Sequence, residues 1–396
     1  MKILHTADWH IGKWVNGFSM LEDQVYIFNQ MFEIIAREKP DVVLVSGDLY
    51  DRSIPSVGAV KLLNETLKKI VIDMKTPVIA IAGNHDSNER LQFASELLKS
   101  SGLYLIGITS HPFEKITLHD TYGEVDFYPI PYMDPLMVGQ IYEDEGIKTH
   151  EQAMQKIMEH IEKHVDYSKR TVALAHGYFS KIQNADAISL EDAGLQLSDS
   201  EKRLSIGGND FVSVHYFDRF DYTALGHLHG PQKVGSHKVK YAGSPLKYSF
   251  SEVHHKKGVF IIEMDEKGDI VAQFMPLIPK RDFKIVRGYL HEILQKQNEE
   301  GVICEDYIRA EIEDTTAIIA PMAKLQSVFP NAMELIRINE IESDRMHRTH
   351  IQLQGKTPID LFSEFYRQVM DASPEEADIT WVKTAMDRIR KEEEAK

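Results

Sequence analysis

Several side chains that could bind metal ions follow short apolar runs in this chain. The run Val78–Ile81 leads into Ala-Gly-Asn-His-Asp at positions 82–86, which presents an amide oxygen, an imidazole and a carboxylate. We expect Gly83 to let the backbone turn sharply at this point, because it has no Cβ to clash. A solvated turn would use the same residue types, so this stretch alone decides nothing.

The same pattern recurs at four more points of the chain. The polar residues concerned are Asp8 and His10 after the first run, Asp48 after the second, His176 after a run at 172–175, and His227 and His229 after a run at 222–225. Asp8 and His10 are two positions apart, as are the two last histidines. In extended segments the members of each pair would point the same way.

The combined set has the composition of a two-metal site. Its members are Asp8, His10, Asp48, Asn84, His176, His227 and His229. Carboxylate, imidazole and amide ligands without a thiolate suit Mn, Fe or Zn at an open site more than a closed structural zinc. Seven ligands predict two ions bridged by one carboxylate, which is the usual clamp for displacement at phosphorus. His85, left over beside Asn84, could protonate the leaving oxygen.

The elements that must position these residues alternate in type. The sequence predicts strands at 3–7, 41–46 and 78–81, separated by helices at 21–35 and 60–70. This alternation is typical of a parallel α/β sheet, in which ligands bind at the carboxyl ends of the strands. Two further strands, at 172–175 and 222–225, flank a polar loop from about 180 to 210, and a strand at 258–264 closes the domain.

The character of the chain changes after Pro276. Strands at 283–287, 307–312 and 333–338, with helices at 290–297 and 318–328, predict a small α+β unit. Beyond it, Thr357 and Ser373 are helix starts that precede apolar positions spaced by three and four, which indicates two amphipathic helices. We predict three parts: a catalytic domain at 1–278, an α+β capping domain at 279–350 and a helical tail at 356–396.

Charge and cysteine content limit the classes of partner and compartment. The chain has 45 Lys+Arg against 61 Asp+Glu, a formal net charge of −16, which argues against unaided, non-specific binding of nucleic acid. Bound metal ions or a partner's surface would have to bring DNA to it. The single cysteine, Cys304, the early position of Asp8 and the lack of a long apolar run lead us to expect a soluble cytoplasmic protein.

The motifs resemble those of the calcineurin-like metallophosphoesterases. The matching segments are Asp8-Trp9-His10, Gly47-Asp48, Gly83-Asn84-His85-Asp86, His176-Gly177 and Gly226-His227-Leu228-His229. Within that superfamily, the stretches at 5–12, 47–51 and 241–252 closely resemble the SbcD family of bacterial nucleases, and the likeness extends over nearly the whole chain. The resemblance implies an α/β fold, a four-layer α-β-β-α sandwich of two mixed sheets flanked by helices.

The resemblance also implies roles for single residues. One manganese ion would be held by Asp8, His10, Asp48 and His229, and the other by Asp48, Asn84, His176 and His227. His85 would be the catalytic imidazole, with Asp86 orienting it. Archaeal and eukaryotic relatives carry a histidine where this chain has Asp51, so what that histidine does with substrate has no counterpart here.

The same resemblance implies partners and substrates. The family pairs with SbcC, a long coiled-coil ATPase on which the helical tail would dock. It acts on DNA ends and hairpins, as a double-strand exonuclease and a single-strand endonuclease, and a homodimer is compatible with it.

Two other functions are compatible with the same metal ligands. A phosphatase or a phosphodiesterase for small substrates could use this fold, although it would need neither the α+β unit nor the tail. A non-catalytic adaptor would not need the complete ligand set and His85. The candidates for contacts with DNA are Lys13, Arg52, Arg90 and the run at 280–284. For each of them, we favour the alternative of an ordinary solvated charge.

Overall fold

The fold is that of a computed structural model, which describes residues 1–109, 113–181, 195–201 and 211–338, together with residues 362, 363, 374 and 379. Met1–Ile336 form one compact unit and Arg337–Lys396 a second. The predicted helical tail at 356–396 lies outside the described residues, apart from the four single positions. Most of the polar loop at 180–210 and the end of the predicted capping domain, 339–350, lie outside them as well.

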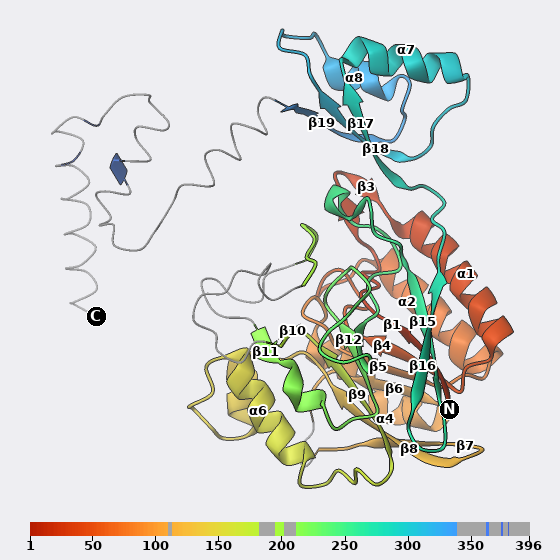
Figure 1. The fold of residues 1–396 in the computed structure, drawn as a ribbon, viewed down its shortest axis with the longest axis vertical. Coiled ribbons are helices and arrows are strands. Elements are labelled where there is room, and N and C mark those ends of the chain that lie inside the picture. Colours follow the sequence, from red (N-terminus) through yellow and green to blue (C-terminus); the bar gives the residue numbers. More distant parts are fainter. Residues whose placement is uncertain are drawn as a thin grey trace. The chain divides into compact units, whose positions relative to one another are not determined.

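The first sheet has six strands in the order β16-β15-β1-β4-β5-β6 (Figure 1). Its parallel strands are β1 (Lys2–Thr6), β4 (Val42–Ser46), β5 (Val78–Ile81) and β6 (Leu103–Ile106). Two antiparallel strands, β15 (Gly258–Met264) and β16 (Ile270–Pro276), extend it beyond β1. The strands predicted at 78–81 and 258–264 coincide with β5 and β15, because both are apolar runs bounded by turn residues.

The second sheet also has six strands, in the order β13-β14-β12-β9-β8-β7. Its four inner strands are parallel: β14 (Val239–Tyr241), β12 (Tyr222–Gly226), β9 (Arg170–His176) and β8 (Gly123–Ile130). The antiparallel edge strands are β13 (Gln232–Lys233) and β7 (Ile116–Asp120). Both sheets are therefore mixed.

Helices cover the outer face of each sheet. Those packed against the first sheet are α1 (Leu21–Glu38), α2 (Val57–Lys68) with a π-helical continuation at Lys69–Asp73, α3 (Asn88–Gln92) and α4 (Ser95–Leu98); those on the second are α5 (Pro135–Ile141) and α6 (His150–Ile161). Short strand pairs complete the domain: β2 (Trp14–Val15) with β3 (Phe18–Ser19), and β10 (Tyr178–Ser180) with β11 (Phe211–Ser213).

Successive side chains of the central strands enter two different cores, because a strand alternates its faces. In β1, Ile3 packs between the sheets with Phe127 and Leu174, whereas its neighbour Leu4 packs on the helix side with Phe28. All five side chains are almost completely buried, and each such burial stabilises the fold by about 1.5–3 kcal/mol. The order of layers is helix, sheet, sheet, helix, so the predicted four-layer sandwich is confirmed.

A third sheet with its own helices follows at the C-terminal end of the first unit. Its strands, in the order β17-β18-β19, are β17 (Phe283–Gly288), β18 (Tyr307–Ile312) and β19 (Ala332–Arg337), and its helices are α7 (Leu290–Glu300) and α8 (Pro321–Gln326). Leu325 and Phe329 pack with Ile308 in a separate core. The predicted boundary at 278 remains a prediction. Within the described ranges, no helix has both the length and the apolar character that a bilayer crossing requires.

Candidate metal centre

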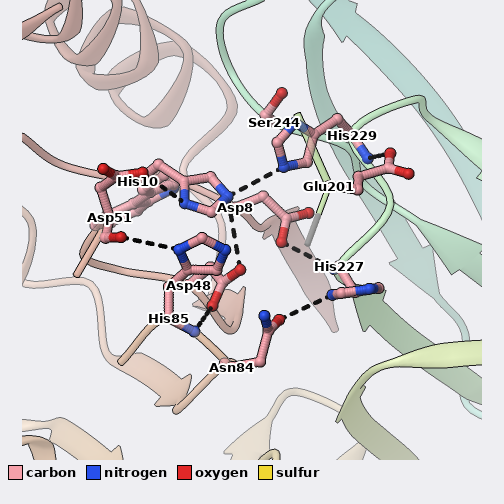
Figure 2. Close-up of polar contacts among 12 residues, drawn as sticks. Asp8, His10, Asp48, Asp51, Asn84, His85, Glu201, His227, His229 and Ser244 are labelled. Atoms are coloured by element: carbon pink, nitrogen blue, oxygen red, sulfur yellow. Dashed lines mark hydrogen bonds and ion pairs between the residues drawn. The ribbon is translucent and has the colours of Figure 1, made fainter. Parts of the chain in front are cut away.

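The predicted ligands meet at the carboxyl ends of strands from both sheets. Asp8, Asp48 and Asn84 follow β1, β4 and β5, whereas His176 ends β9 and His227 follows β12. Ser46 joins the two edges: its hydroxyl donates to the carbonyl of Ala224 at 3.0 Å, and its own carbonyl accepts from His176 Nδ1 at 2.8 Å. The seven ligand residues predicted from sequence are thus brought into one buried site, most of which Figure 2 shows.

The backbone is strained where it presents these side chains. Asp8, His10, Asp48 and His227 have positive φ angles of 53°, 45°, 52° and 107°. A non-glycine residue in this region costs about 1–3 kcal/mol, and such residues concentrate at functional sites. The expectation that Asp8 and His10 share an extended segment is wrong, because β1 ends at Thr6. The two side chains converge because both residues have a left-handed backbone conformation. The N–H of Asp8 donates to the carbonyl of Gly47, and the N–H of His10 donates to the carbonyl of Asp48.

Gly83 is required at its position for space, not for a left-handed turn. Its φ is not positive, and a Cβ placed on it would lie 2.2 Å from Oδ1 and 2.3 Å from the backbone nitrogen of Asp48. No side chain can occupy that space. The motif after β5 therefore uses glycine so that it can approach the carboxylate of Asp48 closely, which the sequence-based expectation of a sharp turn did not identify.

One group of candidate ligands lies around the Oδ2 oxygen of Asp48. Asp8, His10 and Asp48 each offer a ligand atom, and these atoms lie within 4.8 Å of one another. His10 Nε2 lies 3.5 Å from Asp48 Oδ2 and 3.0 Å from His229 Nε2. Asp8 Oδ1 accepts a hydrogen bond from the backbone of His227, but Asp8 Oδ2 is buried without any hydrogen-bond partner.

A second group of ligands adjoins the same oxygen of Asp48. Asp48, His176 and His227 offer ligand atoms within 4.8 Å of one another, and His176 Nε2 lies 3.5 Å from Asp48 Oδ2. Asn84 Oδ1 lies 2.9 Å from both His176 Nε2 and His227 Nδ1. Because His176 Nδ1 faces the carbonyl of Ser46, which can only accept, that nitrogen carries the hydrogen and Nε2 presents a lone pair.

The electrostatics of the site fit divalent cations. Burial, and then the charge of Asp48, raises the pKa of Asp8 well above its ordinary value. Burial also lowers the pKa values of His10, His176 and His227, so these imidazoles are neutral at pH 7, as metal ligands must be. Two buried carboxylates and an oxygen without a partner call for positive charge, which neutral imidazoles do not supply. The residues present therefore fit a site for divalent metal ions.

A third cluster of possible ligands, His10, Asp51 and His85, adjoins the first. Its carboxylate already has a positive partner, because Lys13 Nζ lies 2.7 Å from Asp51 Oδ1. The guanidinium of Arg52 adds a second positive group at 3.6 Å from Asp51 Oδ2. Asp51 is thus neutralised by side chains, and we assign no ion to this cluster.

His85 is held by Asp51 and not by Asp86. His85 Nδ1 lies 2.8 Å from the carbonyl oxygen of Asp51, and the backbone N–H of His85 donates to Asp48 Oδ1 at 2.8 Å. The Asp86 carboxylate instead accepts from the backbone N–H groups of Leu49, Tyr50 and Gly83. Burial, with Asp48 nearby, raises the pKa of Asp86 to about 7 despite these donors. The expected orienting role of Asp86 thus changes: it ties the loop after β4 to the loop after β5.

Sequence analysis did not identify the residues that hold the backbone N–H and the Nδ1 atom of His229. The N–H of His229 donates to Glu201 Oε1 at 2.7 Å, and its Nδ1 lies 2.7 Å from the hydroxyl of Ser200. Glu252 and Lys257 form a buried ion pair beside them, 2.5 Å apart. Burial alone would raise the pKa of Glu252, but Lys257 and His229 together outweigh burial and hold that pKa well below its ordinary range. Glu252 belongs to the stretch at 241–252, which the sequence singled out without a role.

Most of the basic residues considered for DNA contacts already have partners. Arg281 forms ion pairs with Asp23 and Glu22 of α1, and Lys284 lies 2.6 Å from Asp306. Lys13 pairs with Asp51, as described above, and Arg90 donates to the carbonyl of Ser53 at 3.1 Å. The run at 280–284 therefore fastens the third sheet to α1 through Arg281, whereas the side chain of Arg52 is 69% exposed.

Two protein families match this chain, one in its N-terminal part and one in its C-terminal part. Residues 1–231 match the family described as calcineurin-like phosphoesterase, and residues 279–370 match one described as type 5 capsule protein repressor C-terminal domain. The D subunit of the nuclease SbcCD from Staphylococcus epidermidis is 33% identical over 371 residues, which cover 94% of each chain. Its namesake from Staphylococcus saprophyticus is 32% identical over 369 residues, 93% of each chain.

Among solved structures, the protein TT1561 of Thermus thermophilus aligns with 69% of this chain and 98% of its own, at 12% sequence identity. Its TM-score is 0.39, which is too low to support a structural argument.

Proposed function

Because the chain belongs to the calcineurin-like phosphoesterase family and, within it, to the D subunits of SbcCD nucleases, we propose that it hydrolyses phosphodiester bonds of DNA as the nuclease subunit of such a complex. The proposal includes two manganese ions as cofactors. It also includes an SbcC-type coiled-coil ATPase (the C-type partner) and, as the substrates, DNA ends and hairpins.

The observation that carries the proposal is the shared carboxylate of Asp48. Its Oδ2 lies 3.5 Å from His10 Nε2 of the first ligand group and 3.5 Å from His176 Nε2 of the second. A carboxylate that two ligand groups share in this way could bridge two cations. We assign Asp8, His10, Asp48 and His229 to one ion, and Asp48, Asn84, His176 and His227 to the other.

Two such cations, when bound, would activate water and neutralise negative charge on a phosphoryl group. The chain's own residues have the other tasks. Asp48 and Asn84 would hold the second ion from the oxygen side, because Asp48 Oδ2 lies 3.5 Å and Asn84 Oδ1 2.9 Å from His176 Nε2. Ligands of oxygen and nitrogen without sulfur suit manganese, iron or zinc alike, so our choice of manganese follows the resemblance to the SbcD family.

His85 has the geometry of a proton donor to the leaving oxygen. Its Nδ1 is engaged by the carbonyl of Asp51, which leaves Nε2 to carry and release a proton. His85 is partly exposed, unlike the buried ligand His10, whose ring it meets edge-on at 4.7 Å. A general acid must reach both substrate and solvent, and a partly exposed imidazole beside the ligands meets that need.

A phosphodiesterase for small substrates is the competing function. The assay that separates the two supplies the purified chain with manganese and one of three substrates: linear duplex DNA, a cyclic nucleotide or a phosphopeptide. We expect manganese-dependent cleavage of DNA, enhanced by the C-type partner and abolished by EDTA. Faster turnover of the cyclic nucleotide or the phosphopeptide than of DNA, with the partner present, would contradict the proposal.

A further inference from the structure

Glu252, from the stretch at 241–252, and Lys257 both contact His229 on the side away from His10 Nε2. We propose that Glu252 is a positioning residue for His229: it acts through the hydroxyl of Ser200, is itself fixed by Lys257, and sets the affinity of the ion that His229 binds. This inference rests on the proposed ligand role of His229. It assigns a function to the stretch at 241–252, which the proposed chemistry leaves unused.

His229 Nδ1 lies 3.4 Å from Glu252 Oε1, and a chain of two shorter hydrogen bonds through Ser200 connects the same imidazole and carboxylate. His229 Nδ1 lies 2.7 Å from Ser200 Oγ, and Ser200 Oγ donates to Glu252 Oε1 at 2.5 Å. A hydroxyl has one hydrogen, so when it donates to the carboxylate it can only accept from the imidazole. His229 Nδ1 therefore carries the ring hydrogen. The lone pair lies on Nε2, which faces His10 Nε2 across 3.0 Å.

The carboxylate is itself held in one orientation. Its Oε1 also accepts from the backbone N–H of Tyr248 at 3.2 Å and from the hydroxyl of Ser249 at 3.1 Å. Its Oε2 lies 2.5 Å from Lys257 Nζ. Both oxygens are thus engaged, and the Glu252 side chain has no exposed surface. The carboxylate cannot rotate away from Ser200 without breaking several bonds at once.

Lys257 also fixes the backbone of His229. Its three ammonium hydrogens have three acceptors: Glu252 Oε2 at 2.5 Å, the carbonyl of His229 at 2.8 Å and the hydroxyl of Ser244 at 2.9 Å. Figure 2 shows Ser244 beside His229, with Glu201 bonded to the N–H of His229. The side chain, N–H and carbonyl of this one histidine are therefore each held separately.

Stability alone does not explain this arrangement. A buried ion pair is often no more stabilising than apolar side chains of the same size, because both charges lose their hydration. The other imidazoles are supported more simply: His176 Nδ1 faces the carbonyl of Ser46, and His227 Nε2 is buried without a hydrogen-bond partner among the described residues. A carboxylate behind an imidazole makes the ring a better donor to a metal, and loss of such a partner typically weakens binding about 10–100-fold.

The test measures manganese affinity by calorimetric titration of the full-length protein, together with its thermal unfolding. Glu252→Gln keeps the size of the side chain but removes the charge. We expect one of the two binding events to weaken about 10–100-fold and the other to stay unchanged. Asp120→Asn is the matched control, since Asp120 and Arg170 form another buried pair, 2.7 Å apart and outside the site. It should lower the unfolding temperature and leave both affinities unchanged.

Ser200→Ala provides a second route that leaves the ion pair intact. It removes the linking hydroxyl, so it should weaken the same binding event as Glu252→Gln, and it decides the matter if the Gln variant does not fold. Unchanged affinities in a folded Glu252→Gln or Ser200→Ala variant, while His229→Gln loses one binding event, would overturn this inference alone. Two intact binding events in His229→Gln would overturn the ligand assignment on which it rests.

Discussion

The imidazole of His85 and the backbone carbonyl of Asp51 are 2.8 Å apart, and this contact decides which nitrogen of His85 is available to substrate. A carbonyl can only accept, so Nδ1 carries a hydrogen in both protonation states of the ring. Nε2 is then the nitrogen that gains and loses the second proton. The residue that sets this orientation contributes through its main chain, which explains how Asp51 can support His85 while its carboxylate pairs with Lys13.

His85→Ala should separate catalysis from metal binding. We expect this variant to keep its metal ions and to cleave DNA about 10²–10⁴-fold more slowly, which is the usual contribution of general acid catalysis. A p-nitrophenyl phosphodiester has a leaving group that needs no proton, so its hydrolysis should decrease much less. Equal decreases on the two substrates in steady-state assays would contradict the assignment.

Gly83→Ala should damage the centre without replacing any of the assigned ligands. The new Cβ would lie 2.2 Å from Asp48 Oδ1, which forces the shared carboxylate or the loop after β5 to move. We expect manganese binding to weaken at both sites, because Asp48 serves both. Gly58→Ala is the control: it lies in α2, where the nearest atom to a new Cβ is Leu21 Cδ1 at 3.3 Å. Its metal content, measured by elemental analysis, should equal that of the wild type.

The pair of Asp120 and Arg170 predicts a pH-dependent contribution to stability. Hydrogen bonds from the Arg170 guanidinium hold the pKa of Asp120 below its ordinary value. A depressed folded-state pKa stabilises the protein above the unfolded-state value of about 3.9, and this stabilisation is lost as the pH falls further. Asp120→Asn should therefore cost about 3–5 kcal/mol at pH 7. In urea unfolding, a variant penalty that stays the same at pH 7 and pH 3 would contradict this account.

Deletion of residues 356–396 should separate partner binding from hydrolysis. The ligands assigned above all precede Gly230, so manganese-dependent hydrolysis of a small phosphodiester should survive the truncation. Association with the C-type partner should be lost, as expected from two amphipathic helices that dock in a groove. Deletion of 391–396 alone is the matched control. Co-purification of the truncated chain with its partner at full affinity would mean that the partner binds elsewhere.

Sequence alone predicted the central strands well, and the seven residues that it proposed as ligands do lie together, for a physical reason. Each central strand is an apolar run followed closely by a polar residue, as Val78–Ile81 is followed by Asn84. The local sequence therefore specifies both that a strand forms and where it ends. Parallel strands then bring their carboxyl ends together without further information. What failed was local geometry: the left-handed backbone at Asp8 and His10, and the close approach of Gly83 to Asp48, depend on neighbouring loops.

The supporting residues could not be predicted, because they meet only in three dimensions. Ser200 and Glu252 are 52 positions apart and share no periodic pattern, yet their side chains are 2.5 Å apart. The unusual stretch at 241–252 was a signal that this region mattered, but nothing in its spacing connected Glu252 with His229. Asp86 shows the converse case: its position beside His85 suggested a contact that the fold does not make.

The central claim is that Asp48 bridges two cations, and counting manganese ions in crystals by anomalous scattering tests it most directly. The wild-type chain should contain two ions per molecule, one on each side of the Asp48 carboxylate. Asp48→Ala should contain neither and should have no nuclease activity, while its circular dichroism stays that of a folded protein. A single ion in the wild type, or two retained ions in Asp48→Ala, would contradict the account.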